Sequence, residues 1–333
     1  MSRSFSTDAW CSARASEATY MPIAEELARP SQTTARQGSG FTYVLVTPAR
    51  NEAKYIELTI KSVVNQAVRP AKWVIVSDGS TDGTDDVVKD YAARYDWIEL
   101  VRTSERSERH FAGKAEAFNA GYASMTGLAH DVVGNLDADV SIDDADYFRY
   151  LMRKFEENRR LGVVGTSYRE GTIVYPYRYT STEDVTGACQ LFRRECFQSI
   201  GGYPALKFGG IDVVVVLKAQ AEGWQTRTFT EKSCVHHRAV GSAHCVGTCK
   251  RLLQNGQKDY RLGSHPAIVL FRSVYQMTTK PHVIGGVLML VGYVWAMVCR
   301  VERAIPDELI ELRQNDQLRR LKGLVRRTVC FGS

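Results

Sequence analysis

The chain has 333 residues, of which 44% are hydrophobic and 24% charged, the composition of an ordinary globular protein with room for a sizeable core. Its net charge of +6 is modest and does not gather in long runs, which argues against a dedicated nucleic-acid binder. The eight cysteines contain no C-x-x-C pair and no regular spacing, so they indicate free thiols in a reducing compartment. We therefore expect one main domain with appendages.

The first segment, residues 1–40, is rich in Ser, Thr, Ala and Arg. It contains no continuous apolar stretch of the kind that a secretory signal needs. We expect a disordered leader that ends at the Gly-Ser-Gly of residues 38–40.

From residue 41 onward, short apolar runs typical of strands alternate with segments of helical periodicity. The expected strands are 41–47, 72–78, 97–102 and 131–139, and the expected helices lie within 52–67, 83–95 and 112–126. This alternation predicts βαβ units and a mostly parallel α/β sheet with helices on both faces.

Polar side chains follow three of these strands, at the point where each strand ends. They lie in "TPARNEA" (47–53), "SDGSTDGT" (77–84) and "NLDADV" (135–140). Because ligands of such sheets bind beyond the carboxyl ends of the strands, we expect the three loops to form one site.

The third loop contains two carboxylates, Asp137 and Asp139, two positions apart. In an extended chain both point to one face, roughly 6.5–7 Å apart, and would raise each other's pKa unless a cation came between them. A divalent ion with a bound phosphate is one interpretation, and a pair of solvated loop acids is the other. Similarly, Asp78 could bind a nucleotide or simply belong to a turn. Lys114 at the start of a helix is unfavourable there unless an anion lies nearby.

Four segments, "YVLVTPARNEAKYIELTIKSVVNQ", "VIVSDGSTDGTDDVV", "GKAEAFNAGY" and "NLDADV", resemble in order and separation the motifs of family 2 glycosyltransferases with the GT-A (Rossmann-like) fold. The resemblance covers about residues 42–240 and implies a catalytic domain over 41–240. It implies that Asp137 and Asp139 hold Mg²⁺ or Mn²⁺ on the diphosphate of a nucleotide sugar, with Asp139 the more direct ligand. The residues to which it gives a role in donor binding are Pro48, Arg50, Glu52, Asp78, Lys114, Asp137, His237 and Arg238. His236, His237 and Arg238 follow a short expected strand at 226–230 and resemble the positions that contact donor phosphates, and a loop pair with satisfied polar groups is an equal alternative.

The acceptor side resembles the same family. In "TGACQLFRRECFQSIGGYP" (186–204), Gly187 and Ala188 would let the substrate approach the backbone closely. Asp212 lies eleven residues before Gly223, which is the register of the family's catalytic acid, although Ile211 replaces the usual preceding Glu. The resemblance implies that Asp212 is the general base of an inverting transfer, in an apolar setting that could raise its pKa. Without that register, a helix N-cap would be the simpler interpretation.

Residues 241–333 are expected to form a helical, membrane-associated region. "VIGGVLMLVGYVWAMVC" (283–299) is seventeen residues without a charge, near the lower limit for a membrane span, and basic residues flank it on both sides. Its three glycines favour membrane insertion or re-entry over a buried helix. The basic tail at 306–327 could lie on an anionic membrane or be an ordinary solvated helix.

The predicted function is transfer of a sugar from a nucleotide-sugar donor, with a UDP-sugar favoured, to a hydroxyl of a glycan or lipid-linked glycan. The expected setting is cell-surface or exopolysaccharide synthesis at the cytoplasmic face of a membrane. Two alternatives stay open, a sugar transferase that acts on polyprenyl phosphate and a noncatalytic nucleotide-sugar binding protein. A nucleotidyltransferase is disfavoured because "TPARNEA" lacks a glycine-rich triphosphate loop.

Overall fold

The structure, a computed structural model, describes residues 40–103, 111–170, 173–174, 181–238 and 247–330. The leader expected at 1–40 lies outside these residues, apart from Gly40. The strands are β1 (Tyr43–Ala49), β2 (Lys72–Asp78), β3 (Ile98–Thr103), β4 (Val132–Leu136), β5 (Val140–Ser141), β6 (Leu161–Glu170), β7 (Ile173–Val174), β8 (Cys189–Arg193) and β9 (Gln225–His236). The helices that accompany them are α1 (Ile56–Val64), α2 (Thr84–Ala92), α3 (Phe111–Ala123), α4 (Tyr147–Glu157), α5 (Arg194–Ser199) and α6 (Ile211–Ala221).

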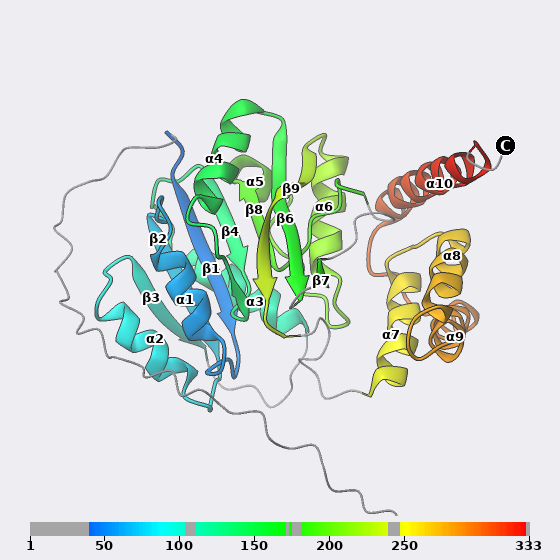
Figure 1. Ribbon diagram of the computed structural model, residues 1–333, viewed down its shortest axis with the longest axis horizontal. Coiled ribbons are helices and arrows are strands. Elements are labelled where there is room, and N and C mark those ends of the chain that lie inside the picture. Colours follow the sequence, from blue (N-terminus) through cyan, green and yellow to red (C-terminus); the bar gives the residue numbers. More distant parts are fainter. Residues whose placement is uncertain (1–39, 104–110, 171–172, 175–180, 239–246, 331–333) are drawn as a thin grey trace, which may run out of the picture. The chain divides into compact units, whose positions relative to one another are not determined.

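The described strands form one mixed sheet in the order β3-β2-β1-β4-β8-β6-β9-β5, with β7 paired to β6 (Figure 1). Strands β3, β2, β1 and β4 run parallel, as the alternation of strands and helices predicts. The second half differs from the expected mostly parallel sheet, because β8 pairs antiparallel with both β4 and β6. No described helix lies between β6 and β8, and an antiparallel neighbour needs no crossover helix.

Both faces of the sheet are covered, and β1 shows how the sequence achieves this. Tyr43 and Leu45 join an apolar cluster with α1, α2 and α4, whereas Val44 and Val46 join a second cluster with α3, α5 and α6. Alternate residues of a strand point to opposite faces, so a continuous apolar run such as that of β1 can fill two cores. Figure 1 shows the two helical layers on either side of the strands.

Beyond the sheet, the described chain is helical. The helices are α7 (Thr248–Arg261), α8 (Pro266–Met277), α9 (Ile284–Val298) and α10 (Asp307–Cys330). The start of α10 packs on α6, where Leu309 shares an apolar cluster with Val214 and Leu217. Within the described ranges, none of the helices has the length and apolar character that crossing a membrane requires.

Candidate active site

The three polar loops meet at the carboxyl edge of the parallel strands, as their positions predict. The backbone N–H of Asn51 donates to Ser80 Oγ at 3.1 Å, and Thr81 N–H donates to Asn51 Oδ1 at 2.9 Å. Glu52 N–H donates to Thr84 Oγ1 at 2.8 Å. These bonds join the loop after β1 to the loop after β2, and the ion pairs of Arg238 with Glu52 and Asp139 join the loop after β1 to the loop after β4.

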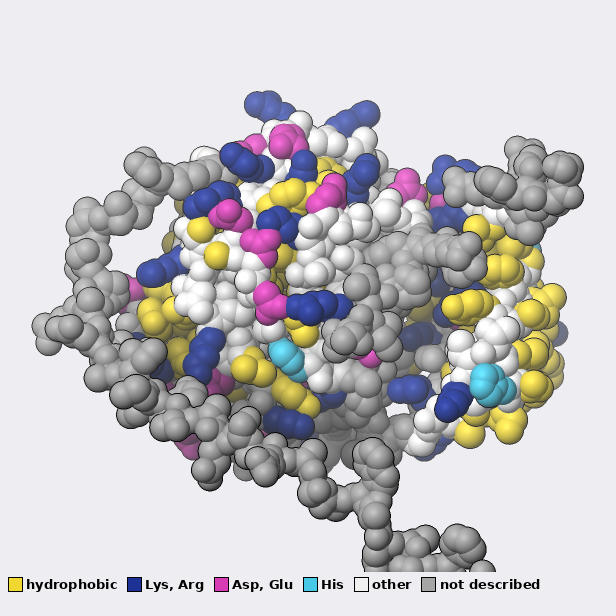
Figure 2. Space-filling model, viewed as in Figure 1, with side chains coloured by type: hydrophobic (Ala, Val, Ile, Leu, Met, Phe, Trp, Pro, Cys, Tyr) yellow, Lys and Arg dark blue, Asp and Glu magenta, His cyan; other side chains and the backbone are white. Residues whose placement is uncertain are grey.

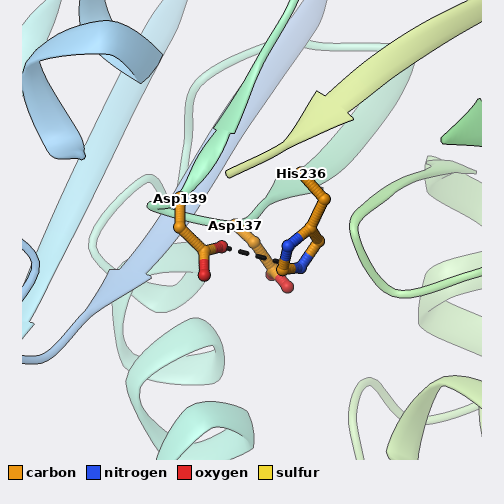
Figure 3. A group of neighbouring side chains, drawn as sticks. All are labelled: Asp137, Asp139 and His236. Atoms are coloured by element: carbon orange, nitrogen blue, oxygen red, sulfur yellow. Dashed lines mark ion pairs between the residues drawn. The ribbon is translucent and has the colours of Figure 1, made fainter. Parts of the chain in front are cut away.

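A cluster of two carboxylates and one imidazole lies at this edge. Potential ligand atoms of Asp137, Asp139 and His236 all lie within 4.8 Å of one another, and Figure 3 shows the three side chains converging. The aspartates follow the end of β4, and His236 is the last residue of β9. Antiparallel pairing of β5 with β9 sets His236 opposite Val140, next to Asp139. His236 Nε2 is 3.8 Å from Asp139 Oδ1.

Within the cluster, the surroundings of Asp139 disfavour its charged form. Burial raises the pKa of Asp139, and the neighbouring charge of Asp137 raises it further, against the opposite effects of His236, Arg238 and Lys114. Burial by itself lowers the pKa of Lys114, but the hydrogen bond and charge of Asp137 together with the charges of Asp212 and Asp139 outweigh burial, and the net shift is upward. Lys114 therefore stays protonated, with Nζ 2.5 Å from Asp137 Oδ1. The anion expected near Lys114 at the start of its helix is thus the carboxylate of Asp137.

The donor set fits a divalent cation. Nδ1 of His236 is buried and has no hydrogen-bond partner within the described part of the chain. Carboxylate oxygens suit Mg²⁺ and Mn²⁺, and an imidazole in the set favours Mn²⁺ over Mg²⁺ because first-row transition ions accept nitrogen ligands more readily. Asp137, Asp139 and His236 are therefore the residues that would hold such an ion.

The residues at 237 and 238 play different parts. The His237 ring bonds to Ser141 Oγ at 2.8 Å and stacks on Tyr55, and burial lowers its pKa. Arg238 forms an ion pair with Glu52, and its Nε is 3.6 Å from Asp139 Oδ2. Arg238 thus bridges the loop after β1 and the carboxylate pair, and it adds positive charge beside Asp139.

The remaining donor-side residues lie along the same edge. The Asp78 side chain is largely buried, accepts from Thr103 Oγ1 at 3.1 Å and lies 3.6 Å from Arg50 Nη1. Pro48 belongs to β1 and is in register with Val76 of β2. The structure therefore brings these predicted donor residues to neighbouring strand ends.

On the acceptor side, Gly187 and Asp212 lie against each other. A Cβ atom placed on Gly187 would be 3.2 Å from Asp212 Cβ and 3.6 Å from its Oδ2. Gly210, with φ 82°, is the N-cap of α6, so Asp212 is in the first turn and is not the N-cap. The capping alternative is therefore wrong. The Asp212 carboxylate raises the pKa of Lys114, and Asp212 and Asp137 both raise the pKa of Tyr203, so the three charged groups belong to one neighbourhood. Ala188 is buried beside Gly187.

Sequence reasoning missed Asn135, and it gave His236 a contact with donor phosphates but no place beside the carboxylates. The position of His236 beside the carboxylates could not be predicted, because the sequence suggests only a short strand at 226–230. In the structure β9 continues to His236 through a register shift that no local pattern signals. Asn135 is buried at the end of β4, and its Nδ2 donates to Asp137 Oδ1 at 3.0 Å and to the Gly187 carbonyl at 2.7 Å. An asparagine inside an apolar strand was the available signal. Asn135 ties the carboxylate pair to the acceptor-side segment.

The sheet, its covering helices and the carboxylate pair define an α/β domain of the GT-A type. A mannosyltransferase of Pyrobaculum calidifontis, solved in complex with GDP-Man and Mn²⁺, superimposes on it with a TM-score of 0.52 and 20% identity, over 82% of this chain and 78% of that one. The model of glycosyl transferase family 2 matches residues 44–207. This part of the chain belongs to that family.

Two curated relatives are similar in sequence to part of this chain. A probable glycosyltransferase of Bacillus subtilis, YdaM, is 29% identical over 123 residues, or 36% of this chain. The poly-beta-1,6-N-acetyl-D-glucosamine synthase of Staphylococcus epidermidis is 30% identical over 129 residues, or 39% of this chain. Each match spans 28% of the length of the relative.

Proposed function

We propose that the domain transfers a sugar from a nucleotide-sugar donor, with a UDP-sugar favoured, to a hydroxyl of a glycan or lipid-linked glycan. The observation that carries the proposal is the convergence of Asp137, Asp139 and His236 at the carboxyl edge of the sheet. A divalent ion bound there would neutralise the charge that develops on the departing nucleoside diphosphate. The similarity to a polysaccharide synthase supports a role in cell-surface or exopolysaccharide synthesis. We place this role on the cytoplasmic side of a membrane.

The chain's own residues supply the other steps. Lys114 and Arg238 are protonated side chains beside the carboxylate pair, placed to bind phosphate oxygens. Asp78 and Arg50 lie at the end of β2 and after β1, on the side where the nucleoside would bind. Asp212 accepts the proton of the acceptor hydroxyl while that oxygen attacks the anomeric carbon and the bond to the diphosphate breaks. One displacement of this kind inverts the anomeric configuration.

The test is nucleoside diphosphate release from UDP-, GDP- and dTDP-sugars, with Mn²⁺ or with chelator, in the presence of glycan acceptors or a lipid extract. We expect one donor to react only with the metal. Asp139→Asn should lose Mn²⁺ binding as well as release. Asp212→Asn should bind donor normally but release product about 10²- to 10⁴-fold more slowly, the usual contribution of a general base.

The matched control is Asp86→Asn, which removes an acid of α2 whose side chain is 83% exposed, and it should change neither quantity. Donor binding without release on any acceptor would contradict the enzyme proposal in favour of a binding protein. Release that needs polyprenyl phosphate and survives Asp212→Asn would contradict the hydroxyl acceptor, because an ionised phosphate needs no base.

A further inference from the structure

The outward surface of α8 and α9 is strongly apolar. Of the fourteen large hydrophobic side chains that are exposed among the described residues, eleven lie between Leu270 and Val298. They include Trp295, which is 52% exposed, and Val298, which is 72% exposed. Figure 2 shows hydrophobic side chains gathered where Figure 1 places α8 and α9. Exposed apolar surface of this density marks a site that binds another apolar surface.

The distribution of side chains on helix α9 is the reverse of that of a helix in a water-soluble protein, which buries its large apolar residues. Its buried side carries Gly285, Gly286 and Gly292, while its outward side carries valines, an isoleucine and a tryptophan. The glycines permit very close packing, since a Cβ on Gly286 would lie 2.1 Å from the Ser273 carbonyl oxygen and one on Gly292 equally close to that of Leu253. Small residues between helices and large apolar residues outside are typical of helices that pack in lipid.

The charges around this surface favour an anionic partner. Residues 247–303 contain eight Lys and Arg but only two acidic residues, whereas the whole chain has a net charge of only +6. Of the two acids, Asp259 is buried and holds Arg272 through two contacts of 2.8 and 2.9 Å. Lys280 and Arg300 are exposed just before and just after α9. Basic residues at the ends of an apolar segment are placed to meet lipid phosphates.

The length of α9 decides how it meets the bilayer. At 15 residues it extends roughly 22 Å, shorter than the roughly 30 Å of a hydrocarbon core. We propose that the outward side of α8 and α9, the docking face, lies in the plane of an anionic membrane with its valines and Trp295 below the headgroups. The face holds the protein on the membrane without crossing it. This inference does not depend on the transfer reaction.

The first test measures binding of the full chain to vesicles by flotation, with phosphatidylcholine alone or mixed with phosphatidylglycerol. We expect binding that is stronger with the anionic lipid and weaker at high salt. The double variant Val287→Glu, Val291→Glu should lower affinity by about a hundredfold, since each lost valine insertion accounts for roughly tenfold. The control is Leu58→Glu, which alters a leucine of α1 that is 44% exposed, close to the 43% of Val287. It should bind as the parent does.

The second test locates Trp295 in the membrane. Brominated lipids should quench part of the tryptophan fluorescence of the parent protein, and Trp295→Phe should abolish that part while binding persists. Thermal unfolding of each variant verifies that it is folded. Absence of quenching, equal binding to both vesicle types, or binding that the double variant retains would each overturn the proposal. The proposal would also be overturned if the parent protein were a dimer in light scattering and bound no vesicles, while the double variant were a monomer. The docking face would then join two copies of the chain.

Discussion

Replacing Gly187 with alanine should slow sugar transfer by displacing Asp212. The new Cβ would lie 3.2 Å from Asp212 Cβ, whereas carbon atoms pack at about 3.5–4.0 Å. Gly187 is not among the glycines with positive φ, so alanine brings no backbone strain at this position. The substitution therefore acts mainly on the position of the Asp212 carboxylate.

The size of the effect follows from the overlap. Asp212 must move by about 0.3–0.8 Å to restore normal contact. If a misplacement of about 1 Å costs about a hundredfold in rate, a shift of this size costs roughly four- to fortyfold, or about 1–2 kcal/mol in activation free energy. Donor affinity should change little, since the substitution does not alter the donor-side residues.

The assay is a double-mutant cycle on the rate of nucleoside diphosphate release at saturating donor. Gly187→Ala should slow the parent protein but should have almost no further effect when Asp212→Asn is already present, because the group that it displaces no longer acts as a base. If the two substitutions multiply, or if Gly187→Ala retains the full rate, the assignment of Asp212 as the base is wrong.

Three further predictions test packing, the site and the thiols. Gly292→Ala should lower the free energy of unfolding by about 1–3 kcal/mol or more in denaturant titrations, because α7 and α9 must separate. A Cβ on Gly323 in α10 would meet no atom within 4 Å apart from its own stretch of helix, so Gly323→Ala should instead raise the free energy of unfolding by up to about 1 kcal/mol. A lower free energy of unfolding for Gly323→Ala would contradict the packing argument. Asn135→Ala removes the hydrogen bonds to Asp137 and Gly187, so it should lower the free energy of unfolding by about 1–3 kcal/mol. It should also weaken Mn²⁺ binding measured by electron paramagnetic resonance, and an unchanged Mn²⁺ affinity would count against the role given to Asn135. Among the described residues, burial raises the pKa of the Cys196 and Cys234 thiols to about 12 and that of the Cys189 thiol above its ordinary value. Alkylation at about pH 8, followed by mass spectrometry, should therefore leave these three thiols unmodified and modify the exposed thiols of Cys249 and Cys299.

Local sequence patterns are sufficient to predict the first half of the sheet. The runs at β1, β2 and β4 are mostly apolar and buried along their length, so they predict strands that are buried on both faces, and the helical spacing between them predicts crossover helices. Parallel strands then bring the polar loops to one edge whatever the details of packing. The carboxylate pair at Asp137 and Asp139 could be located on this basis alone, and so could Asp78.

The sequence by itself thus determined the class of fold, the edge that carries the site and the apolar, charge-free character of residues 283–299. Only the tertiary structure decided that His236 rather than His237 joins the carboxylates, because the register of β9 against β5 depends on pairing between strands about a hundred residues apart. The contact of Arg238 with Glu52 spans 186 positions and follows from no local pattern. Which side of α9 faces outward was likewise invisible, since the helix is apolar all around and its orientation is set by the backbones that its glycines touch.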